Sequence, residues 1–398
     1  MLNRVTRLLQ PEAVPPGFES LSPGVFHAST IVFPNLDAFL GRQERLDHGY
    51  SYGQNGTPTY YELALKIAAL EGGGSAVLVP TGLAAIVAVN AAFLRAGESV
   101  LVPEGAYGPS LDTLRALFGR WGIETVLYPT GAGARIAEHM TPKTRLIWTE
   151  SPCSNTMEMQ DVPAIARVAH EHGALVAMDN TWATPLGFRP LEYGVDFAMQ
   201  ALTKYVGGHS DLLMGAVTTT NEAHYHTLRE TVERLGYAVS PSDCFMALRG
   251  IGTMALRLER HFASALKVAA VVREHPAVAA VNYPPLPGAA GHDLWSRDYT
   301  LGSGALSFRL REPGLEPLRH FCAVLRLFRL GASWGGLHSL VAVVPEHGVA
   351  ELGERGDAQW LVRLHVGLED PADLVADLRA ALNSACNQGR DSARRAVE

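Results

Sequence analysis

The amino-acid sequence predicts an α/β protein with a mainly parallel sheet flanked by helices, followed by a smaller α+β domain. Between residues 57 and 249, short apolar runs alternate with stretches of helical period, as in βαβ units whose sheet is covered on both faces. After about residue 250 this alternation gives way to a long helical stretch and well-separated strands. The 398 residues are 47% hydrophobic and 18% charged, so the chain can bury a large core and is not disordered.

Residues 1–56 are irregular and rich in Gly, Pro, His and Tyr, so we expect them to form an extended N-terminal arm. The domain over residues 57–249 then holds the parallel sheet, with strands expected at Ala76–Val79, Ser99–Val102, Glu124–Tyr128, Arg145–Trp148, Ala174–Met178 and Val195–Met199. Helices are expected at Leu83–Leu94, Ser110–Trp121 and Val162–His172. Ligands of such sheets bind beyond the carboxyl ends of the strands, so residues that follow a strand are the candidates for a site.

The smaller domain, over residues 250–398, is expected to follow a long helix, Cys244–His275, that bends at Gly250 and Gly252. Its other expected elements are Gly304–Leu310, Ser339–Val344, Trp360–Val366 and a final helix, Pro371–Ala385. Separated strands and helices of this kind predict a small α+β domain.

Charge and cysteine content exclude several classes of protein. With 33 Lys and Arg against 40 Asp and Glu, the net charge of −7 gives no general basic field for a nucleic-acid backbone. The four cysteines lie far apart, at Cys153, Cys244, Cys322 and Cys386. Neither a disulfide framework nor a metal site is therefore expected, and a reduced, cytoplasmic compartment is the simplest interpretation.

A membrane partner is not expected either. The uncharged segment 72–94 has glycines, a proline and Asn90 inside it, so it predicts a buried strand, a turn and a helix rather than a membrane span. The first 16 residues lack an apolar stretch long enough for a secretory signal.

Lys204 and Asp179 are the first candidates for chemistry. Lys204 lies between mostly apolar residues and a pair of glycines, and a desolvated lysine becomes a nucleophile. Asp179 ends the apolar run ALVAM, at the position where α/β sheets bind ligands. Each also has an ordinary explanation, a lysine that reaches the surface from a strand end and an aspartate in a turn. Together they fit pyridoxal phosphate, because the lysine forms an imine and the carboxylate keeps the pyridine nitrogen protonated.

A phosphate group would need a cradle, and the turn Pro80–Leu83 offers one. It connects a strand to a helix, where backbone N–H groups and the helix dipole favour an anion, and Gly82 lets the backbone approach closely. An ordinary βα turn would have the same sequence. Thr203, beside Lys204, offers a hydroxyl.

Tyr107 and Arg363 complete the candidate site. Tyr107 follows the strand Ser99–Val102, where its ring could stack on a cofactor and its hydroxyl could assist proton transfer. Alternation in WLVRLHV places Arg363 and His365 on one face of a strand, where a guanidinium can bind a substrate carboxylate with two hydrogen bonds. Exposure of that face to solvent is the alternative.

Seven segments of the sequence together resemble those of a known family. The segments are YGQNGTPT, LEGGGSAVLVPTG, ESPCSNTMEMQDVPAI, MDNTWATP, ALTKYVGGHSD, SWGGLHSL and RLHVGLED. The chain is similar, from about residue 20 to 385, to the Cys/Met-metabolism pyridoxal-phosphate enzymes of fold type I. The resemblance implies the aminotransferase-like fold of that group. Within the family, Ser333-Trp334-Gly335-Gly336 resembles the β-lyases, because the γ-enzymes usually carry leucine in place of the tryptophan.

The resemblance implies a role for each candidate residue. Lys204 would form the imine and, with Tyr107, move the Cα proton; Asp179 would hold the pyridinium and Tyr107 would stack on the ring. Phosphate would be held by the backbone at Gly82 and Leu83 and by Thr203, and Tyr52 would reach the phosphate of a neighbouring subunit. Arg363 would bind the substrate α-carboxylate with Ser333 and Trp334 nearby. A homotetramer, a dimer of active dimers, is expected.

Three positions depart from the family pattern. Gln54 stands where many members have a phosphate-binding arginine, Ser154 where many have a substrate-contacting asparagine, and Ala332 where the bacterial β-lyases often have a larger side chain. These changes leave the reaction class intact and leave the preferred sulfur substrate open.

The resemblance implies a carbon–sulfur β-lyase that cleaves L-cystathionine to homocysteine, pyruvate and ammonia, a step of methionine biosynthesis. The alternatives within the family are a γ-lyase, a sulfhydrylase, and a lyase that acts on cysteine or its S-conjugates. An alternative of another class is a protein that binds pyridoxal phosphate without turnover, which the Gln54 departure suggests.

Overall fold

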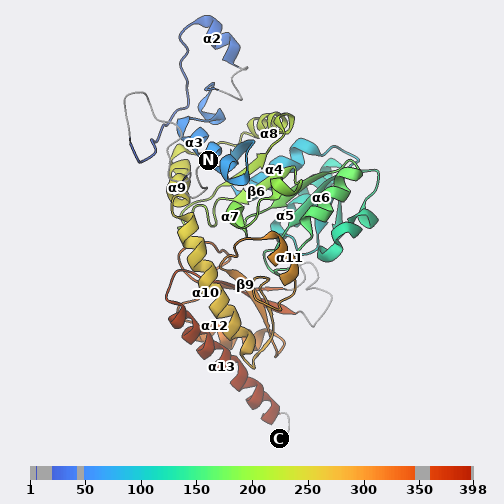
Figure 1. Cartoon of the computed structure of the whole chain (residues 1–398), viewed down its shortest axis with the longest axis vertical. Coiled ribbons are helices and arrows are strands. Elements are labelled where there is room, and N and C mark those ends of the chain that lie inside the picture. Colours follow the sequence, from blue (N-terminus) through green and yellow to red (C-terminus); the bar gives the residue numbers. More distant parts are fainter. Residues whose placement is uncertain (1–5, 7–19, 43–48, 346–358, 396–398) are drawn as a thin grey trace.

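The structure, a computed structural model, describes residues 6, 20–42, 49–345 and 359–395 (Figure 1). Parts of the arm predicted over residues 1–56, namely 1–5, 7–19 and 43–48, lie outside the described residues, and so do 346–358 and 396–398. In the described part of the arm, the short helix α2 (Leu36–Leu40) stands apart from the rest of the molecule. Tyr52 forms an isolated β-bridge with Thr30.

The larger domain is built on a seven-stranded sheet of described residues. Its strands are β1 (Ser75–Val79), β2 (Ser99–Pro103), β3 (Glu124–Tyr128), β4 (Thr144–Glu150), β5 (Leu175–Asp179), β6 (Phe197–Ala201) and β7 (Gly215–Thr219), in the order β1-β7-β6-β5-β4-β2-β3. All neighbours pair in parallel except β7, which is antiparallel to both β1 and β6. The prediction of a mainly parallel sheet is confirmed. The sequence analysis missed β7, a five-residue strand of small residues and threonines that carries no strong apolar signal.

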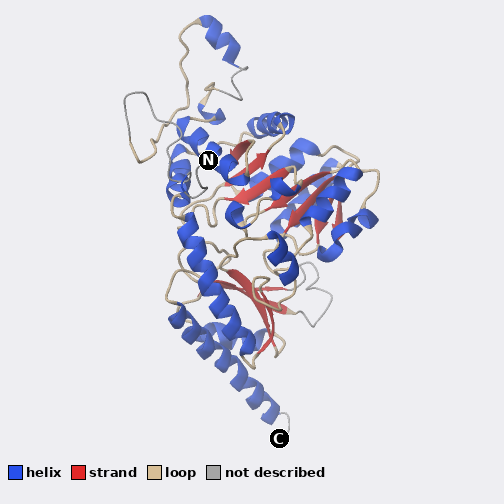
Figure 2. Ribbon diagram, in the orientation of Figure 1, coloured by secondary structure: helices blue, strands red, loops and turns tan. Residues whose placement is uncertain are grey.

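Helices cover both faces of this sheet (Figure 2). They are α3 (Pro58–Glu71), α4 (Gly82–Phe93), α5 (Gly108–Thr113), α6 (Val162–Glu171), α7 (Thr184–Gly187) and α8 (Glu222–Arg234). Shorter or irregular helical segments lie at Gly53–Asn55, Leu114–Phe118, Gly119–Trp121, Thr130–His139 and Pro190–Tyr193. Alternate residues of β1 enter different clusters, Val77 and Val79 with α4 and Leu78 with α3. The strands are therefore apolar on both sides, which is why they read as continuous hydrophobic runs.

The uncharged segment 72–94 forms β1, a turn and α4, as expected. None of the helices that the structure describes is long and apolar enough to cross a membrane.

The predicted helix Cys244–His275 is divided into two, α9 (Pro241–Ile251) and α10 (Met254–Glu274). The predicted bend is confirmed, and at Gly252 and Thr253 it becomes a break. Gly250 is required for packing, because a Cβ there would lie 2.3 Å from the carbonyl oxygen of Gly207. The predicted domain boundary, between residues 249 and 250, falls near the end of α9 and stays a prediction.

The smaller domain has a second sheet with helices against it (Figure 1). In the described residues its strands are β8 (Val278–Asn282), β9 (Ala305–Leu310), β10 (Arg329–Leu330), β11 (Leu340–Pro345) and β12 (Trp360–His365), in the order β10-β11-β12-β9-β8. Only the β10–β11 pair is parallel. The helices of this domain are α10, α11 (His292–Asp298), α12 (Leu315–Val324) and α13 (Pro371–Arg395). The α+β prediction is confirmed, while β8 and β10 were not expected.

Candidate active site

Most of the predicted site residues line one cavity of about 310 Å³ at the carboxyl ends of the parallel strands. They come from both domains and are Gly82, Leu83, Tyr107, Ser154, Asp179, Thr203, Lys204, Trp334 and Arg363. Ala332 lines the same cavity. The chain thus brings together residues up to 281 positions apart, from Gly82 to Arg363.

Lys204 follows β6, and its partly buried side chain lines this cavity. Its Nζ donates a hydrogen bond to the Ser333 hydroxyl at 2.8 Å and lies 5.4 Å from the centre of the Trp334 ring. Burial, and then the nearby Arg363 charge, lower the pKa of Lys204 to about 8, against an opposing effect of Asp179. The lowered pKa leaves a useful fraction of this amine unprotonated, so it can act as a nucleophile near neutral pH.

Arg257 holds the loop that carries Lys204, and this residue was not among the sequence predictions. The buried guanidinium of Arg257, on α10, donates to the carbonyl oxygens of Tyr205 at 2.8 Å and Gly250 at 2.6 Å. The neighbouring Gly208 has a positive φ of 72°, and a Cβ there would collide with the Arg257 guanidinium. Arg257 therefore ties the lysine loop to α9 and α10.

Asp179 ends β5, and its carboxyl group is buried. Its Oδ1 accepts hydrogen bonds from the Thr181 backbone N–H at 2.9 Å and the Thr181 hydroxyl at 2.5 Å. The turn explanation is thus correct for one oxygen, while Oδ2 has no hydrogen-bond partner among the described residues. Burial raises the pKa of Asp179, and the Thr181 hydrogen bonds and the Lys204 charge oppose that shift.

Glu150 is a second buried carboxylate at this edge of the sheet, and the sequence analysis missed it. It ends β4 directly beside Asp179 in the register of the two strands. Its Oε2 accepts from the backbone N–H of Tyr107 at 2.8 Å and its Oε1 from that of Ser154 at 2.7 Å. Burial, with the Asp179 charge as the second cause, raises the pKa of Glu150 to about 7. The apolar run before it, as for Asp179, was the available sequence signal.

Arg363 lies on β12 with 8% of its surface exposed, so the alternative of a solvent-facing side is wrong. Its Nη1 donates to the Asn155 side-chain oxygen at 2.8 Å, and burial lowers its pKa. His365, on the same face of the strand, is buried, and one ring nitrogen lies 2.8 Å from the Gly336 carbonyl oxygen. Burial lowers the pKa of His365 to about 3, so this ring is neutral and Arg363 is the cation of that face.

The turn before α4 has the form of an anion cradle. Thr81 caps the helix, with its hydroxyl oxygen accepting from the Ala84 N–H at 2.9 Å. Gly82 is required there, because a Cβ would lie 2.8 Å from that of Ala201. The Thr203 hydroxyl donates to the Met214 carbonyl at 3.2 Å and accepts from its N–H at 3.0 Å, so it is held in place at the cavity wall.

Tyr52 and Gln54 do not line this cavity in the single chain. Tyr52 is half exposed, and the Gln54 side chain donates to the carbonyl oxygen of Glu233 at 2.9 Å. Their contact with a neighbouring subunit stays a prediction.

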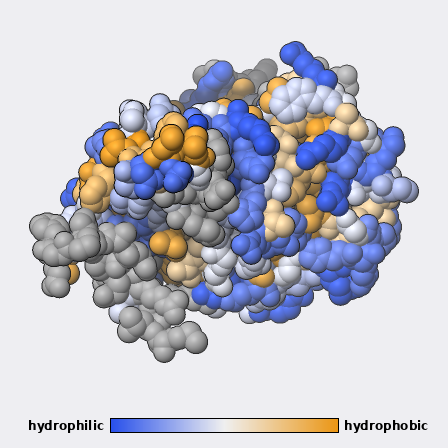
Figure 3. Space-filling model, turned by 90° about the horizontal axis from the view of Figure 1, so that it is seen from above, coloured by the Kyte–Doolittle hydropathy of each residue, from blue (hydrophilic) through white to orange (hydrophobic). Residues whose placement is uncertain are grey.

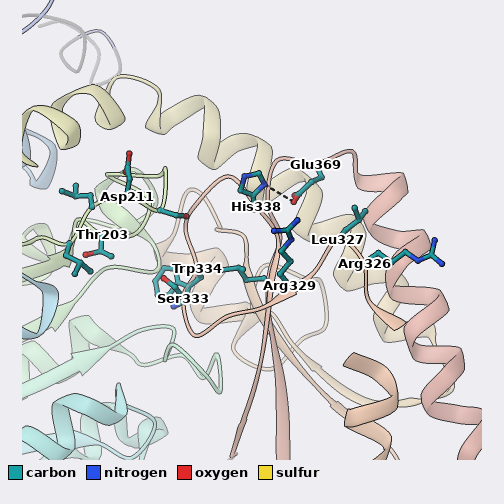
Figure 4. Close-up of a pocket in the computed structure, with 13 residues that line it drawn as sticks. Thr203, Asp211, Arg326, Leu327, Arg329, Ser333, Trp334, His338 and Glu369 are labelled. Atoms are coloured by element: carbon teal, nitrogen blue, oxygen red, sulfur yellow. Dashed lines mark ion pairs between the residues drawn. The ribbon is translucent and has the colours of Figure 1, made fainter. Parts of the chain in front are cut away.

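A larger cavity of about 840 Å³ adjoins the first and shares Thr203, Leu213 and Trp334 with it (Figure 4). Its wall includes charged or titratable residues at Asp211, Arg326, Arg329, His338 and Glu369. The His338 ring and the Glu369 carboxylate point toward one another, with 4.0 Å between Nδ1 and Oε1. The inner cavity therefore adjoins a roomy vestibule whose wall carries several charged side chains.

The fold and this constellation define a known class of protein. Residues 6–383 match the model of the Cys/Met metabolism PLP-dependent enzyme family. The chain belongs to this family, whose cofactor is pyridoxal 5′-phosphate. The resemblance seen in the sequence is thereby confirmed, and the chain is an enzyme.

Two relatives named as β-lyases match nearly the whole chain. One is a putative cystathionine beta-lyase of Rhizobium johnstonii, 44% identical, with 92% of each chain covered. The other is the cystathionine beta-lyase MetC of Escherichia coli, 39% identical, with 89% of this chain and 91% of the relative covered. Less similar relatives have other names, including an L-alanine/L-glutamate racemase and an L-methionine gamma-lyase, both 36% identical.

The fold is also that of solved enzymes of this family. The structure of cystathionine gamma synthase from Xanthomonas oryzae pv. oryzae, in complex with aminoacrylate and cysteine, matches with a TM-score of 0.89 at 29% identity. The match covers 97% of this chain and 99% of that chain. The fold type I architecture predicted from the resemblance is confirmed.

Proposed function

We propose that the protein is a carbon–sulfur β-lyase that cleaves L-cystathionine to homocysteine, pyruvate and ammonia, a step of methionine biosynthesis. The observation that carries this proposal is the convergence of Lys204, Asp179 and Arg363 on one cavity. These are an amine, a buried carboxylate and a buried guanidinium, which suit the aldehyde and pyridine nitrogen of the cofactor and the carboxylate of an amino acid.

The residues of the cavity fit pyridoxal phosphate. The backbone N–H groups of Gly82 and Leu83 begin the twelve-residue helix α4, where an anion is favoured. The Oδ2 atom of Asp179 has no other described partner and suits the pyridine N–H. Tyr107 lines the same cavity, where its ring can stack on the cofactor. These residues would hold the cofactor, and Lys204 would bind it covalently.

When bound, pyridoxal phosphate supplies an electron sink that stabilises negative charge on the substrate Cα. Lys204 would take the proton from Cα, because its lowered pKa of about 8 leaves a useful fraction of the amine unprotonated. The pKa of Tyr107 is raised by burial and by Asp179 and Glu150, so its phenol stays protonated. Tyr107 therefore serves as a stacking ring and proton donor, and Lys204 as the base.

Trp334 supports β- rather than γ-elimination. Its ring lies 5.5 Å from the ring of Tyr205 and beside the Lys204 amine. β-Elimination requires one proton to leave Cα, whereas γ-elimination requires a second to leave Cβ. A bulky indole next to Lys204 restricts the movement that the second transfer needs.

A lyase for cysteine or its S-conjugates is the second candidate, and the small residues Ala332 and Ser154 favour it. Both line the inner cavity, and Ser154 has a buried hydroxyl without a partner among the described residues. The larger vestibule leaves room for leaving groups of several sizes.

Product analysis tests the proposal. The purified protein, loaded with pyridoxal phosphate, is incubated with L-cystathionine, and the keto acid and thiol are identified. Pyruvate with homocysteine is the expected result. Oxobutyrate with cysteine would assign a γ-lyase instead. Turnover of S-alkyl cysteines without turnover of cystathionine would favour the second candidate.

We further propose that the enzyme is a homotetramer, a dimer of active dimers in which the arm reaches a neighbouring site. The described arm exposes large hydrophobic residues at Leu21, Val32, Leu36 and Leu40, and hydrophobic patches occur on the face at that end of the molecule (Figure 3). Such exposure favours burial against another chain. Light scattering of the holoenzyme should give four times the chain mass of 42.8 kDa, and a monomer would contradict this.

A further inference from the structure

Asn155 joins the two domains through a hydrogen bond to Arg363, which lines the inner cavity. It lies in the loop between β4 and α6, and its side-chain oxygen accepts from Nη1 of Arg363, on β12 of the smaller domain. The two residues are 208 positions apart. Among the described residues, this 2.8 Å contact is the one hydrogen bond of the Arg363 guanidinium, and Arg363 also lines the cavity.

The Asn155 loop is held in place before any ligand binds. Glu150 accepts from the backbone N–H of Ser154, the residue directly before Asn155. The loop is closed by backbone hydrogen bonds from Cys153 N–H to the Glu158 carbonyl at 3.0 Å and from Met157 N–H to the Cys153 carbonyl at 2.9 Å. Asn155 therefore presents its oxygen to Arg363 from a rigid support.

A neutral acceptor suits this position. No carboxylate of the described chain lies within 4.0 Å of the Arg363 guanidinium, so its positive charge is not already paired. An aspartate in place of Asn155 would pair with that charge and compete with a bound carboxylate. An amide oxygen instead fixes one N–H group and leaves the charge and the remaining donors for the ligand.

We propose that Asn155 is a positioning residue that orients the Arg363 guanidinium toward the α-carboxylate of the substrate. This inference rests on the proposed role of Arg363. A flexible arginine side chain loses conformational freedom when it binds a carboxylate, and prior fixation of one N–H reduces that loss. The expected effect is on carboxylate recognition and not on the chemical step.

The test separates carboxylate binding from binding to the cofactor itself. Glycine and ethylamine both carry an amine, but only glycine has the carboxylate, and the visible absorption of the holoenzyme reports the binding of each. Asn155→Ala should weaken glycine binding about tenfold, the loss expected for one hydrogen bond to a charged group, with ethylamine binding unchanged within about twofold. Asn155→Asp should weaken glycine binding further. The KM for the sulfur substrate should rise with little change in kcat.

Thr156→Ala is the matched control, because it removes a hydrogen bond to Glu158 on the same loop without touching Arg363. It should bind glycine as the wild type does. Equal losses of glycine and ethylamine binding in Asn155→Ala would indicate a merely structural role and overturn the proposal. Unchanged glycine binding would overturn it as well.

Arg363→Ala distinguishes this proposal from the proposed function. If Arg363→Ala loses glycine binding and Asn155→Ala does not, the positioning role of Asn155 is wrong while the proposed role of Arg363 stands. If Arg363→Ala binds glycine as tightly as the wild type, the proposed role of Arg363 is wrong and the role of Asn155 falls with it.

Discussion

Glu150 and Asp179 end neighbouring parallel strands in register, and both carboxyl groups are buried at the same edge of the larger sheet. Asp179 lines the cavity beside Lys204, while Glu150 holds the backbone of the two loops that carry Tyr107 and Ser154. Two buried carboxyl groups so close together do not ionise independently. Burial raises the pKa of both groups, that of Glu150 to about 7, and the two carboxyl groups therefore resist carrying two charges at once.

Glu150 should make the stability of the apoprotein depend on pH. The folded state keeps a proton on Glu150 up to about pH 7, whereas the unfolded chain releases it near the ordinary value of 4.5. This contribution to the free energy of unfolding is present in full below pH 4.5 and is lost as the pH rises to about 7. Glu150→Gln should reduce the decline between pH 5 and 8 by up to about 3 kcal/mol, measured by urea unfolding.

Glu71 provides the matched control for this experiment. It is also buried, accepts from the Gln200 side chain, and has a pKa raised to about 7 by burial, but it does not line the cavity. Glu71→Gln should therefore flatten the same decline and leave the cofactor spectrum unchanged. A wild-type pH dependence in Glu150→Gln would show that Glu150 is not protonated in the folded state.

Loss of Arg257 should release the lysine loop. Arg257→Ala leaves the carbonyl groups of Tyr205 and Gly250 without their buried donor, which should destabilise the protein by about 2–4 kcal/mol. The dissociation constant of pyridoxal phosphate should rise at least about tenfold, because Lys204 is no longer held. Thermal unfolding and equilibrium dialysis measure the two effects. Arg319→Ala, at an exposed site on α12, should change neither, and cofactor affinity at the wild-type level in Arg257→Ala would contradict the account.

Gly82 should not tolerate a side chain. In Gly82→Ala the new Cβ would lie 2.8 Å from that of Ala201 and 3.3 Å from the Met199 side chain, which forces the start of α4 outward. We expect a loss of about 1–3 kcal/mol of stability and weaker binding of the cofactor phosphate, measured by titration with pyridoxal phosphate. Gly131→Ala, where no atom lies within 4 Å of the added Cβ, is the control. Equal cofactor affinities in the two variants would show that this turn is not the cradle.

Trp334→Leu should reduce the selectivity of the enzyme for β-elimination over γ-elimination. A smaller side chain beside the Lys204 amine allows it to move further along the substrate, so the ratio of oxobutyrate to pyruvate formed from L-cystathionine should rise. Quantification of both keto acids checks this. Tyr205 contacts Trp334, so a melting temperature close to that of the wild type is needed to exclude a packing defect. An unchanged product ratio in a well-folded variant would mean that Trp334 does not determine selectivity.

The candidate residues that the sequence revealed are those with a local signal. Lys204, Asp179 and Arg363 stand out because each interrupts an apolar run at a strand end or alternates along a strand. Asn155 and Arg257 have no such signal, because Arg363 lies 208 positions from Asn155 and Tyr205 lies 52 positions from Arg257, and only the tertiary fold brings each pair together. Glu150 had the same strand-end signal as Asp179, but its role depends on which strands are neighbours.

The strands, like the site residues, were predicted where the sequence carries a local signal and were missed where it does not. The parallel strands were predicted because burial on both faces makes them continuously apolar. The antiparallel strand β7, of small residues and threonines, and the two-residue strand β10 give no comparable pattern. Tyr52 and Gln54 lie outside the cavity of the single chain, and their role toward a neighbouring subunit comes from the family resemblance alone.

The central claim is that Lys204 performs β-elimination on a sulfur amino acid, and the most direct test compares wild type with Lys204→Ala. Both holoproteins receive L-cystathionine, with Lys267→Ala, an exposed lysine on α10, as the control. The account predicts pyruvate and homocysteine from the wild type and the control, and a rate at least about 1,000-fold lower from Lys204→Ala. Full turnover by Lys204→Ala, or oxobutyrate with cysteine from the wild type, would contradict it.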